Sequence, residues 1–124
     1  MKKIILDTNF ILTCVKQKID FFEEIKFMGM QILIPKQVIK EIKKIINSKK
    51  KLHFKEDAKI ALKLLEKSKF KKIDLKIDYV DKGLIKLAEK NKDVVIATLD
   101  RELKNKIQNS ILVIRGKKKL KIIR

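Results

Sequence analysis

The sequence is short of the residues that build disulfides and zinc sites. Its 124 residues include one cysteine, Cys14, and one histidine, His53. A single cysteine excludes an internal disulfide and is typical of a protein kept in a reducing cytoplasm. Because zinc sites are built from clustered cysteine and histidine, the shortage of both argues against zinc. We expect Cys14 to be a small core residue on a helix and His53, beside a lysine run, to be an exposed loop residue.

Long apolar runs are also missing. Only three consecutive apolar residues precede Asp7, which is too few for the core of a signal peptide. No later run approaches the length of a membrane span, so we expect a soluble, cytoplasmic protein with no membrane partner. One proline and 45% apolar residues at regular spacing are typical of a folded, helix-rich protein. We expect one domain, residues 1–124, with a basic C-terminal segment at 115–124.

Acidic residues and aromatics are scarce as well. The chain has 15 Asp and Glu against 33 Lys and Arg, a formal net charge of +18. Such a surplus attracts polyanions at long range and favours nucleic acid as a partner. Lys/Glu-rich surfaces also accompany thermophilic proteins, but glutamate is not comparably enriched here. With no tryptophan and 6% aromatics, recognition of a single strand by an aromatic platform is disfavoured.

Short apolar strands alternate with helices along the chain. The apolar spacing predicts strands at 3–6, 31–34, 72–75, 94–99 and 111–114, separated by helices. The alternation predicts an α/β protein of three layers, α/β/α, in which helices cover both faces of a central parallel sheet of four or five strands. In such sheets, ligands bind beyond the carboxyl ends of the strands.

Two aspartates stand where predicted strands end. Asp7 and Asp100 each follow directly on an apolar strand, so they would share one crevice if the strands are neighbours. Glu41, in the second turn of a predicted helix, and Asp81, in the first turn of another, also lie near strand ends. Four converging carboxylates repel one another unless a cation compensates them, and Mg²⁺ or Mn²⁺ prefers oxygen ligands. The pattern therefore predicts a metal site.

Ordinary structural roles explain each of these acids when it is taken alone. Glu41 could form a surface ion pair with Lys44, three residues further along the helix. Aspartate is a common N-cap, and three helices have candidates at their starts: Asp7, Asp78 or Asp81, and Asp100. Capping explains each position separately but not the four together.

Five ordered segments carry a resemblance to a known family. They are ILDTNFI (5–11), IPKQVIKEI (34–42), VDKGLIKLA (80–88), VVIATLDRELKNKI (94–107) and ILVIRGKKKL (111–120). Through them the chain resembles PIN-domain nucleases along nearly its full length, particularly small archaeal-type proteins related to VapC toxins and to ribosome-assembly PIN endonucleases. The most specific segment is 94–107, with its strand–Thr–x–Asp–x–x–Leu pattern.

The resemblance implies a metal-dependent endoribonuclease. It places Asp7, Glu41, Asp81 and Asp100 at the family's acidic, metal-binding positions. Glu102 would be an additional outer ligand, although a first-turn glutamate that responds to the helix dipole explains it as well. One or two Mg²⁺ or Mn²⁺ ions at these acids would activate water for hydrolysis of an RNA phosphodiester.

Supporting roles complete this interpretation. Asn9 and Thr98 would orient the carboxylates by hydrogen bonding, with ordinary turn and strand roles as the alternative. Basic residues would bring RNA to the acids, although a solvated surface is the commoner role of any one lysine. The candidates are Lys36, Lys40, Lys82, Arg101, Lys104, Arg115, Lys117, Lys118 and Lys119. The resemblance also implies a homodimer and, depending on the role, an antitoxin or a ribosome-assembly partner.

The chain departs from the family pattern at two positions. Lys82 stands where many relatives have a second acid, which would weaken a second metal site or water network, and Leu99 stands where asparagine is frequent. The high charge and Lys82 leave open a non-catalytic RNA-binding or ribosome-assembly module with the same fold. An aspartyl phosphatase is a weaker alternative, because Asn9 takes the place of its second aspartate. Toxin-like and RNA-maturation roles, rRNA processing included, are not separated by the sequence.

Overall fold

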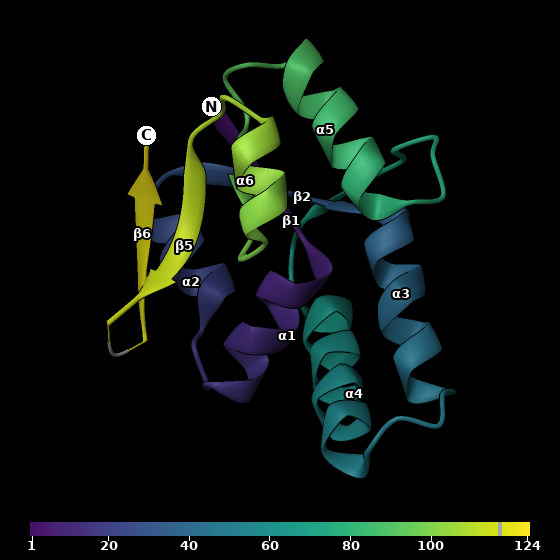
Figure 1. The fold of residues 1–124 in the computed structure, drawn as a ribbon. Helices are drawn as coiled ribbons and strands as arrows, with labels where there is room; N and C mark the ends of the chain where they lie inside the picture. Colours follow the sequence, from purple (N-terminus) through teal and green to yellow (C-terminus); the bar gives the residue numbers. More distant parts are fainter. Residues whose placement is uncertain (117) are drawn as a thin grey trace.

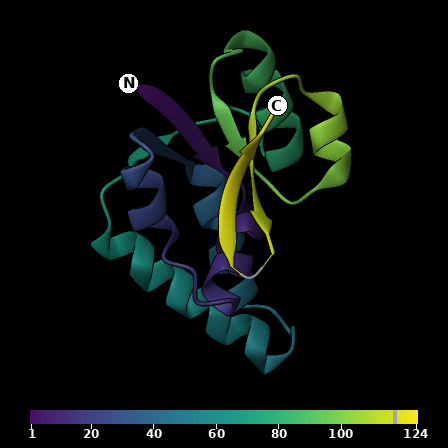
Figure 2. The same cartoon turned by 90° about the vertical axis from the view of Figure 1, so that its left-hand side faces the viewer.

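The chain folds around one six-stranded sheet with the strand order β3-β2-β1-β4-β5-β6. The computed structural model describes residues 1–116 and 118–124. Helices α1 to α4 lie on one side of the sheet and α5 and α6 on the other (Figures 1 and 2). The strands are β1 (Lys2–Leu6), β2 (Met30–Pro35), β3 (Lys71–Ile73), β4 (Val95–Ala97), β5 (Ile111–Arg115) and β6 (Lys119–Ile123). The helices are α1 (Thr8–Lys16), α2 (Phe21–Phe27), α3 (Lys36–Ile46), α4 (Leu52–Lys67), α5 (Val80–Lys90) and α6 (Arg101–Lys106).

The predicted α/β fold with a parallel central sheet is confirmed. Strands β3, β2, β1, β4 and β5 pair in parallel, and the sheet has one strand more than the predicted four or five. The additional strand is β6, which returns antiparallel along β5 and pairs Arg115 with Lys119 and Ile111 with Ile123. Leu120 is buried between exposed lysines, which is the alternation of a strand with one covered face.

Two boundaries differ from the sequence prediction in ways that affect the acids. Strand β4 ends at Ala97, so Thr98 and Leu99 separate it from Asp100. Helix α5 begins at Val80 with Tyr79 as its N-cap, two residues later than the apolar spacing predicts. The expectation that Asp100 directly follows a strand is therefore wrong.

The core is formed by the central strands and the helix faces against them. Ile4, Ile5 and Leu6 of β1 are fully buried, because a parallel sheet covered on both faces leaves neither side of its central strands in water. Cys14 is buried on α1, as expected, and burial raises the pKa of its thiol to about 12. His53 lies in the first turn of α4, not in a loop, and is exposed. Among the described residues, no helix has both the length and the apolar character needed to cross a membrane.

Helix α5 packs closely on the segment that precedes it. A Cβ atom added to Gly83 would lie 2.8 Å from the Cβ atom of Leu75, which is closer than real side chains approach. Gln37 of α3 holds the same segment: its Oε1 atom accepts a hydrogen bond from the Leu75 backbone N–H at 3.1 Å, and its Nε2 atom donates to Asp74 Oδ1 at 2.7 Å. The start of α5 is thereby placed against the start of α3, as Figure 1 shows.

This packing predicts that Gly83→Ala destabilises the protein. Alanine improves helix propensity by about 1 kcal/mol, but overpacking against Leu75 costs about 1 to 3 kcal/mol. We expect a net loss of stability in urea unfolding, measured beside Leu75→Ala and the double variant. In this double-mutant cycle the two substitutions should couple, because Leu75→Ala removes the Cγ and Cδ1 atoms that the new Cβ would meet at 3.3 and 2.9 Å, although the Leu75 Cβ atom remains. Additive losses would show that Gly83 is not limited by the Cγ and Cδ1 atoms of Leu75.

Candidate active site

Asp7 is held between two strands and the start of a helix. The backbone N–H of Asp7 donates to the Ala97 carbonyl at 3.0 Å, which extends the pairing of β1 with β4. Its Oδ1 atom accepts from the Thr8 backbone N–H at 2.8 Å, and its Oδ2 atom accepts from the Thr98 hydroxyl at 2.9 Å. The side chain is 5% exposed. The carboxylate is thus oriented from both sides and nearly removed from water.

Thr8 connects Asp7 to Glu41. The Thr8 hydroxyl donates a hydrogen bond to Glu41 Oε1, so α1 is joined to α3 at the site. The sequence prediction assigned such orienting bonds to Asn9 and Thr98. Asn9 is exposed and, within the described residues, its side chain donates to no acid. Successive helix residues are rotated by about 100°, so Thr8 faces α3 while Asn9 turns away.

Glu41 and Asp81 face the same cavity. This cavity of about 490 Å³ lies between α3 and the start of α5. Its lining residues are Gln37, Lys40, Glu41, Lys44, Asp78, Tyr79, Val80 and Asp81. Glu41 is half-buried and Asp81 is exposed in the first turn of α5. Sequence reasoning treated Asp78 only as a cap and did not name Tyr79, because their neighbours on α3 are far away in the chain.

Asp100 has a different environment from the other three acids. It is the N-cap of α6, and its Oδ1 atom accepts from the backbone N–H groups of Glu102 at 2.9 Å and Leu103 at 3.4 Å. Its own N–H donates to the Thr98 hydroxyl at 3.1 Å, so Thr98 bridges Asp100 and Asp7. Within the described part of the chain, no hydrogen bond reaches Asp100 Oδ2. One carboxylate oxygen therefore caps the helix while the other is uncommitted.

The capping explanation accounts for only part of the set. It holds fully for Asp100, and Asp7 also caps its helix, although it accepts from the first helical N–H only. It does not hold for Asp81, because Tyr79 is the N-cap of α5, and it does not concern Glu41. The alternative pair of Glu41 with Lys44 is not formed: in the described residues the one salt bridge joins Lys36 to Asp74 at 3.1 Å.

Electrostatics distinguish Asp7 from an ordinary surface acid. Burial raises the pKa of its carboxyl to about 6, the hydrogen bonds from Thr98 and Thr8 lower it in part, and the charges of Asp81 and Glu41 raise it further. All the groups around it offer oxygen atoms, a donor set that fits a hard divalent cation. Among described residues, no three acidic, histidine or cysteine side chains are close enough to share one ion. The acids are electrostatic neighbours and not a closed coordination shell.

A basic cluster lies on the same side of the sheet as α6. Burial and the charges of Arg115, Arg101 and Arg124 all lower the pKa of Lys104. Arg124 donates to the carbonyl oxygens of Lys104 and Ile107, each at 2.7 Å. Cations that lower the pKa of Lys104 in this way are concentrated around it, which suits a polyanion. Arg124 was not among the basic residues predicted from the sequence.

The other predicted basic residues are dispersed. Lys40 lines the acidic cavity, whereas Lys82 places its Nζ atom 5.3 Å from the centre of the Tyr79 ring. Lys36 is paired with Asp74 and supports the segment before α5. Lys118 and Lys119 are exposed at the turn between β5 and β6, and Lys117 lies outside the described residues.

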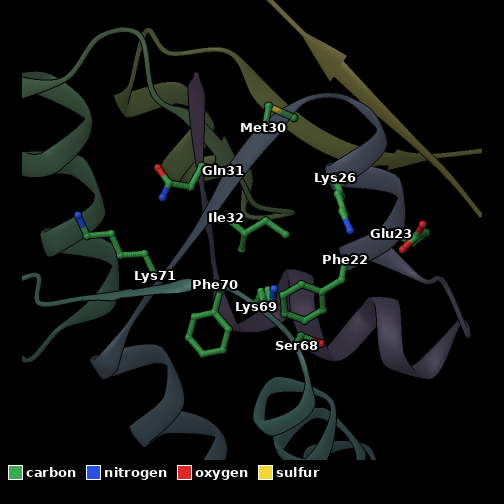
Figure 3. Close-up of a pocket in the computed structure, with 10 residues that line it drawn as sticks. All are labelled: Phe22, Glu23, Lys26, Met30, Gln31, Ile32, Ser68, Lys69, Phe70 and Lys71. Carbon is green, nitrogen blue, oxygen red and sulfur yellow. The ribbon is translucent and has the colours of Figure 1, made fainter.

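A larger cavity lies away from the acids. It measures about 650 Å³ and is lined by ten residues of α2, β2 and the chain before β3, among them Phe22 and Phe70, whose ring centres are 6.3 Å apart (Figure 3). Met30 and Ile32 belong to the beginning of β2, whereas Asp7 follows the end of the parallel strand β1. Glu23 is its one acid. The cavity lacks converging acids, so size alone does not mark the candidate active site.

Comparison with known proteins identifies the family. Residues 4–119 match a family described as a PIN-like domain. The chain belongs to the PIN-like domain family. Ribonuclease VapC4 of Methanocaldococcus jannaschii is 32% identical to it over 128 residues, which cover 98% of this chain and 97% of that protein. The resemblance seen in the sequence is therefore confirmed.

Solved structures share the architecture of this PIN-like domain. The PIN domain endonuclease Utp24 superposes with a TM-score of 0.79 at 26% identity, covering 98% of this chain and 91% of that one. VapBC2 from Rickettsia felis, bound to a DNA fragment from its promoter, superposes with a TM-score of 0.55 at 14% identity. That match covers 90% of this chain and 98% of the other and shows a common fold.

The raised pKa of Asp7 predicts a pH-dependent difference between the wild type and Asp7→Asn. Since the folded pKa of about 6 exceeds the ordinary aspartate value of 3.8, folding favours the protonated carboxyl. The stability it contributes is present below about pH 4 and is lost as pH rises through 6, by about 3 kcal/mol. Without divalent ions, the free energy of unfolding of Asp7→Asn should therefore rise relative to that of the wild type between pH 4 and 7.5.

Urea unfolding of both proteins in EDTA at the two pH values measures this difference. Asparagine also caps helices, so the variant keeps the bond from Thr8. Asp93→Asn, at an exposed acid before β4, is the matched control. An Asp7→Asn advantage that stays constant across this pH range would contradict the raised pKa.

Proposed function

We propose that this PIN-like domain is a metal-dependent endoribonuclease that hydrolyses RNA phosphodiester bonds. The observation that carries the proposal is a buried Asp7 whose pKa is raised by burial and by neighbouring Asp81 and Glu41, in a chain with a net charge of +18. A site that keeps uncompensated carboxylates among so many cations lowers the stability of the fold, which is typical of functional sites. The names of the relatives, ribonuclease VapC4 and endonuclease Utp24, support the same chemistry.

In this proposal Asp7, Glu41, Asp81 and Asp100 hold Mg²⁺ or Mn²⁺, with Glu102 as an outer ligand. The ion supplies Lewis acidity and an activated water when it is bound. Thr98 and Thr8 hold the Asp7 carboxylate, and Thr8 also holds Glu41, so two of the acids are oriented before any ligand enters. Lys40 and Lys44 line the cavity beside Glu41 and face an incoming phosphate. Residues 1–124 act as one domain, with 115–124 adding basic charge.

The biological role and partners are part of the proposal. VapC4 is named as a ribonuclease, and another structural relative is a VapBC2 complex, which favours a toxin-like role with an antitoxin. A homodimer is proposed from the family resemblance. The Utp24 likeness favours RNA maturation with a ribosome-assembly partner. A cleavage product at one site of a structured RNA would favour maturation, and inhibition by a small co-encoded protein would favour the toxin-like role.

A non-catalytic RNA-binding or ribosome-assembly module is the second candidate. One observation favours it: within the described residues no three acids lie close enough to share an ion, and one Asp100 oxygen caps α6. The basic cluster around Lys104 serves this module as well as an enzyme. The two candidates differ in whether the protein cleaves RNA and needs the acids to do so.

The first prediction from this proposal concerns cleavage. Wild-type protein should cut RNA in Mg²⁺ or Mn²⁺, and Asp7→Asn and Asp100→Asn should each slow cleavage at least about 100-fold, since a metal ion's contribution is worth several kcal/mol. Asp100→Asn is informative because asparagine caps a helix as well as aspartate does, so only the charge is removed. Asp93→Asn should cut at the wild-type rate.

Cleavage is followed on a labelled RNA with and without EDTA. If the wild type leaves RNA intact in both ions, the second candidate replaces the first. If Asp100→Asn alone keeps the wild-type rate, Asp100 is a cap and not a ligand.

The second prediction concerns the basic cluster. Removing two charges with Arg101→Gln and Lys104→Gln should weaken RNA binding and reduce the slope of log affinity against log salt by about 1.4, if each contacts one phosphate of a single strand. Lys2→Gln with Lys92→Gln lowers the net charge equally at two exposed positions, the first residue of β1 and the loop before β4, and should leave the slope nearly unchanged. Equal effects of the two pairs would show that RNA responds only to net charge. Both pairs of substitutions are made in the Asp7→Asn background. Filter binding of each protein to RNA across a salt series measures its slope.

A further inference from the structure

An exposed aromatic ring stands at the acidic cavity. Tyr79 is 70% exposed, and its residue lines the cavity together with Glu41 and Asp81. Its position is set by the backbone, because it is the N-cap of α5 and its carbonyl accepts from the Gly83 N–H at 3.0 Å. In the described structure its hydroxyl has no hydrogen bond to hold it in place. The backbone of Tyr79 is therefore fixed, while its ring is exposed and accessible to a ligand.

Exposure alone does not set Tyr79 apart. Phe27 is 94% exposed and Leu52 is 70% exposed, and single apolar side chains on a surface are ordinary. Neither Phe27 nor Leu52 lines the acidic cavity, whereas Tyr79 does. Phe27 ends α2, which lies across the molecule from α5 (Figure 1). Of these three exposed residues, only Tyr79 lines a cavity together with proposed metal ligands.

The charges around the ring match a nucleotide. The Nζ atom of Lys82 lies 5.3 Å from the centre of the Tyr79 ring, and Lys40 and Lys44 line the same cavity from α3. A nucleotide presents a flat aromatic base and an anionic phosphate a few ångströms apart, so a ring flanked by ammonium groups can bind both parts. Lys82 is thereby given a use at this site.

We propose that Tyr79 stacks on the base of an unpaired nucleotide next to the scissile phosphate, with Lys82 contacting that nucleotide's phosphate. This inference rests on the proposed function, since it names how the same site selects its RNA. In the interior of a duplex both faces of a base are covered by its neighbours, so away from duplex ends only an unpaired base can place a face against the ring. Tyr79 is therefore a specificity residue that favours single-stranded RNA over duplex RNA.

The chain contains a built-in probe for this contact. Tyr79 is its one tyrosine and it has no tryptophan, so the tyrosine fluorescence of the protein comes from this ring alone. Stacking on a base quenches that emission, whereas a phosphate chain without bases does not. The titration uses Asp7→Asn in Mg²⁺, so that the RNA stays intact. The ligands are an oligoadenylate of about ten nucleotides, an abasic ribose-phosphate oligomer of equal length and a blunt RNA duplex. Free tyrosinamide corrects for absorption by the RNA.

Affinities of substituted proteins complete the test. Oligoadenylate should quench the emission and the other two ligands should not. In the same background, Tyr79→Leu and Tyr79→Ala should lose roughly 5- to 150-fold in affinity for oligoadenylate, while Tyr79→Phe stays within about twofold of its parent. Affinity for the abasic oligomer should not change in any of them. Phe27→Ala, which removes the most exposed aromatic ring, should bind all three ligands like the parent.

The outcomes separate this inference from the proposed function. Equal quenching by the abasic oligomer, unchanged oligoadenylate affinity in Tyr79→Leu, or equal losses on the duplex would each overturn the stacking role. Absence of binding to oligoadenylate would overturn it as well. If the wild type fails to cleave RNA but oligoadenylate quenches selectively, the ribonuclease proposal fails while Tyr79 remains a base-stacking residue. If the wild type cleaves RNA but oligoadenylate does not quench the emission, the stacking role fails while the ribonuclease proposal stands.

Discussion

Burying the Asp7 carboxylate costs free energy, and the residues around it are arranged to offset that cost. A carboxylate that is 5% exposed needs hydrogen bonds, and it receives one from the Thr8 backbone and one from the Thr98 hydroxyl. The Thr98 donor depends on the pairing of β1 with β4, because this register places Asp7 beside Thr98, whereas the Thr8 donor is the next residue in the chain. The site is thus tied to the most buried part of the sheet.

From this carboxylate, hydrogen bonds lead to two of the other acids. The Thr8 hydroxyl reaches Glu41 on α3, and the Thr98 hydroxyl accepts from the backbone of Asp100 at the start of α6. Asp81 is outside this chain of bonds and influences Asp7 through its charge. Its position depends instead on Gln37, which holds the segment before α5. The acids are therefore positioned by two separate sets of contacts, and motion of the start of α5 changes the site without breaking the hydrogen bonds of Asp7.

The parts of this arrangement that depend on local pattern could be predicted from the sequence. Asp7 ends an apolar strand, and the alternation of strands and helices indicates a parallel sheet, so both the fold and the first acid could be predicted. The end of β4 could not, because Thr98 and Leu99 suit a strand as well as the irregular connection that they form. Strand β6 was missed because Lys119–Ile123 was included in a basic C-terminal segment, although its Lys–Leu–Lys alternation is that of a strand.

Contacts between segments that are distant in the sequence could not be predicted from such local patterns. Thr8 and Gln37 are ordinary polar residues in the sequence, and their roles follow only from α1 packing on α3 and α3 packing on the segment before α5. The placement of Tyr79 in the acidic cavity depends on the same packing. A low aromatic content disfavours an extended stacking platform, but it does not exclude a single ring beside the acids.

The position of Glu41 shows how acids stay available in a chain with so many lysines. Lys44 follows it by three residues on α3, a spacing that permits a salt bridge, and both residues line one cavity. Glu41 is instead held by Thr8, whose hydroxyl draws the carboxylate towards α1. A hydroxyl satisfies one lone pair and leaves the negative charge in place, whereas an ammonium group would neutralise it. Threonine at the start of α1 therefore orients Glu41 without removing the charge that a cation needs.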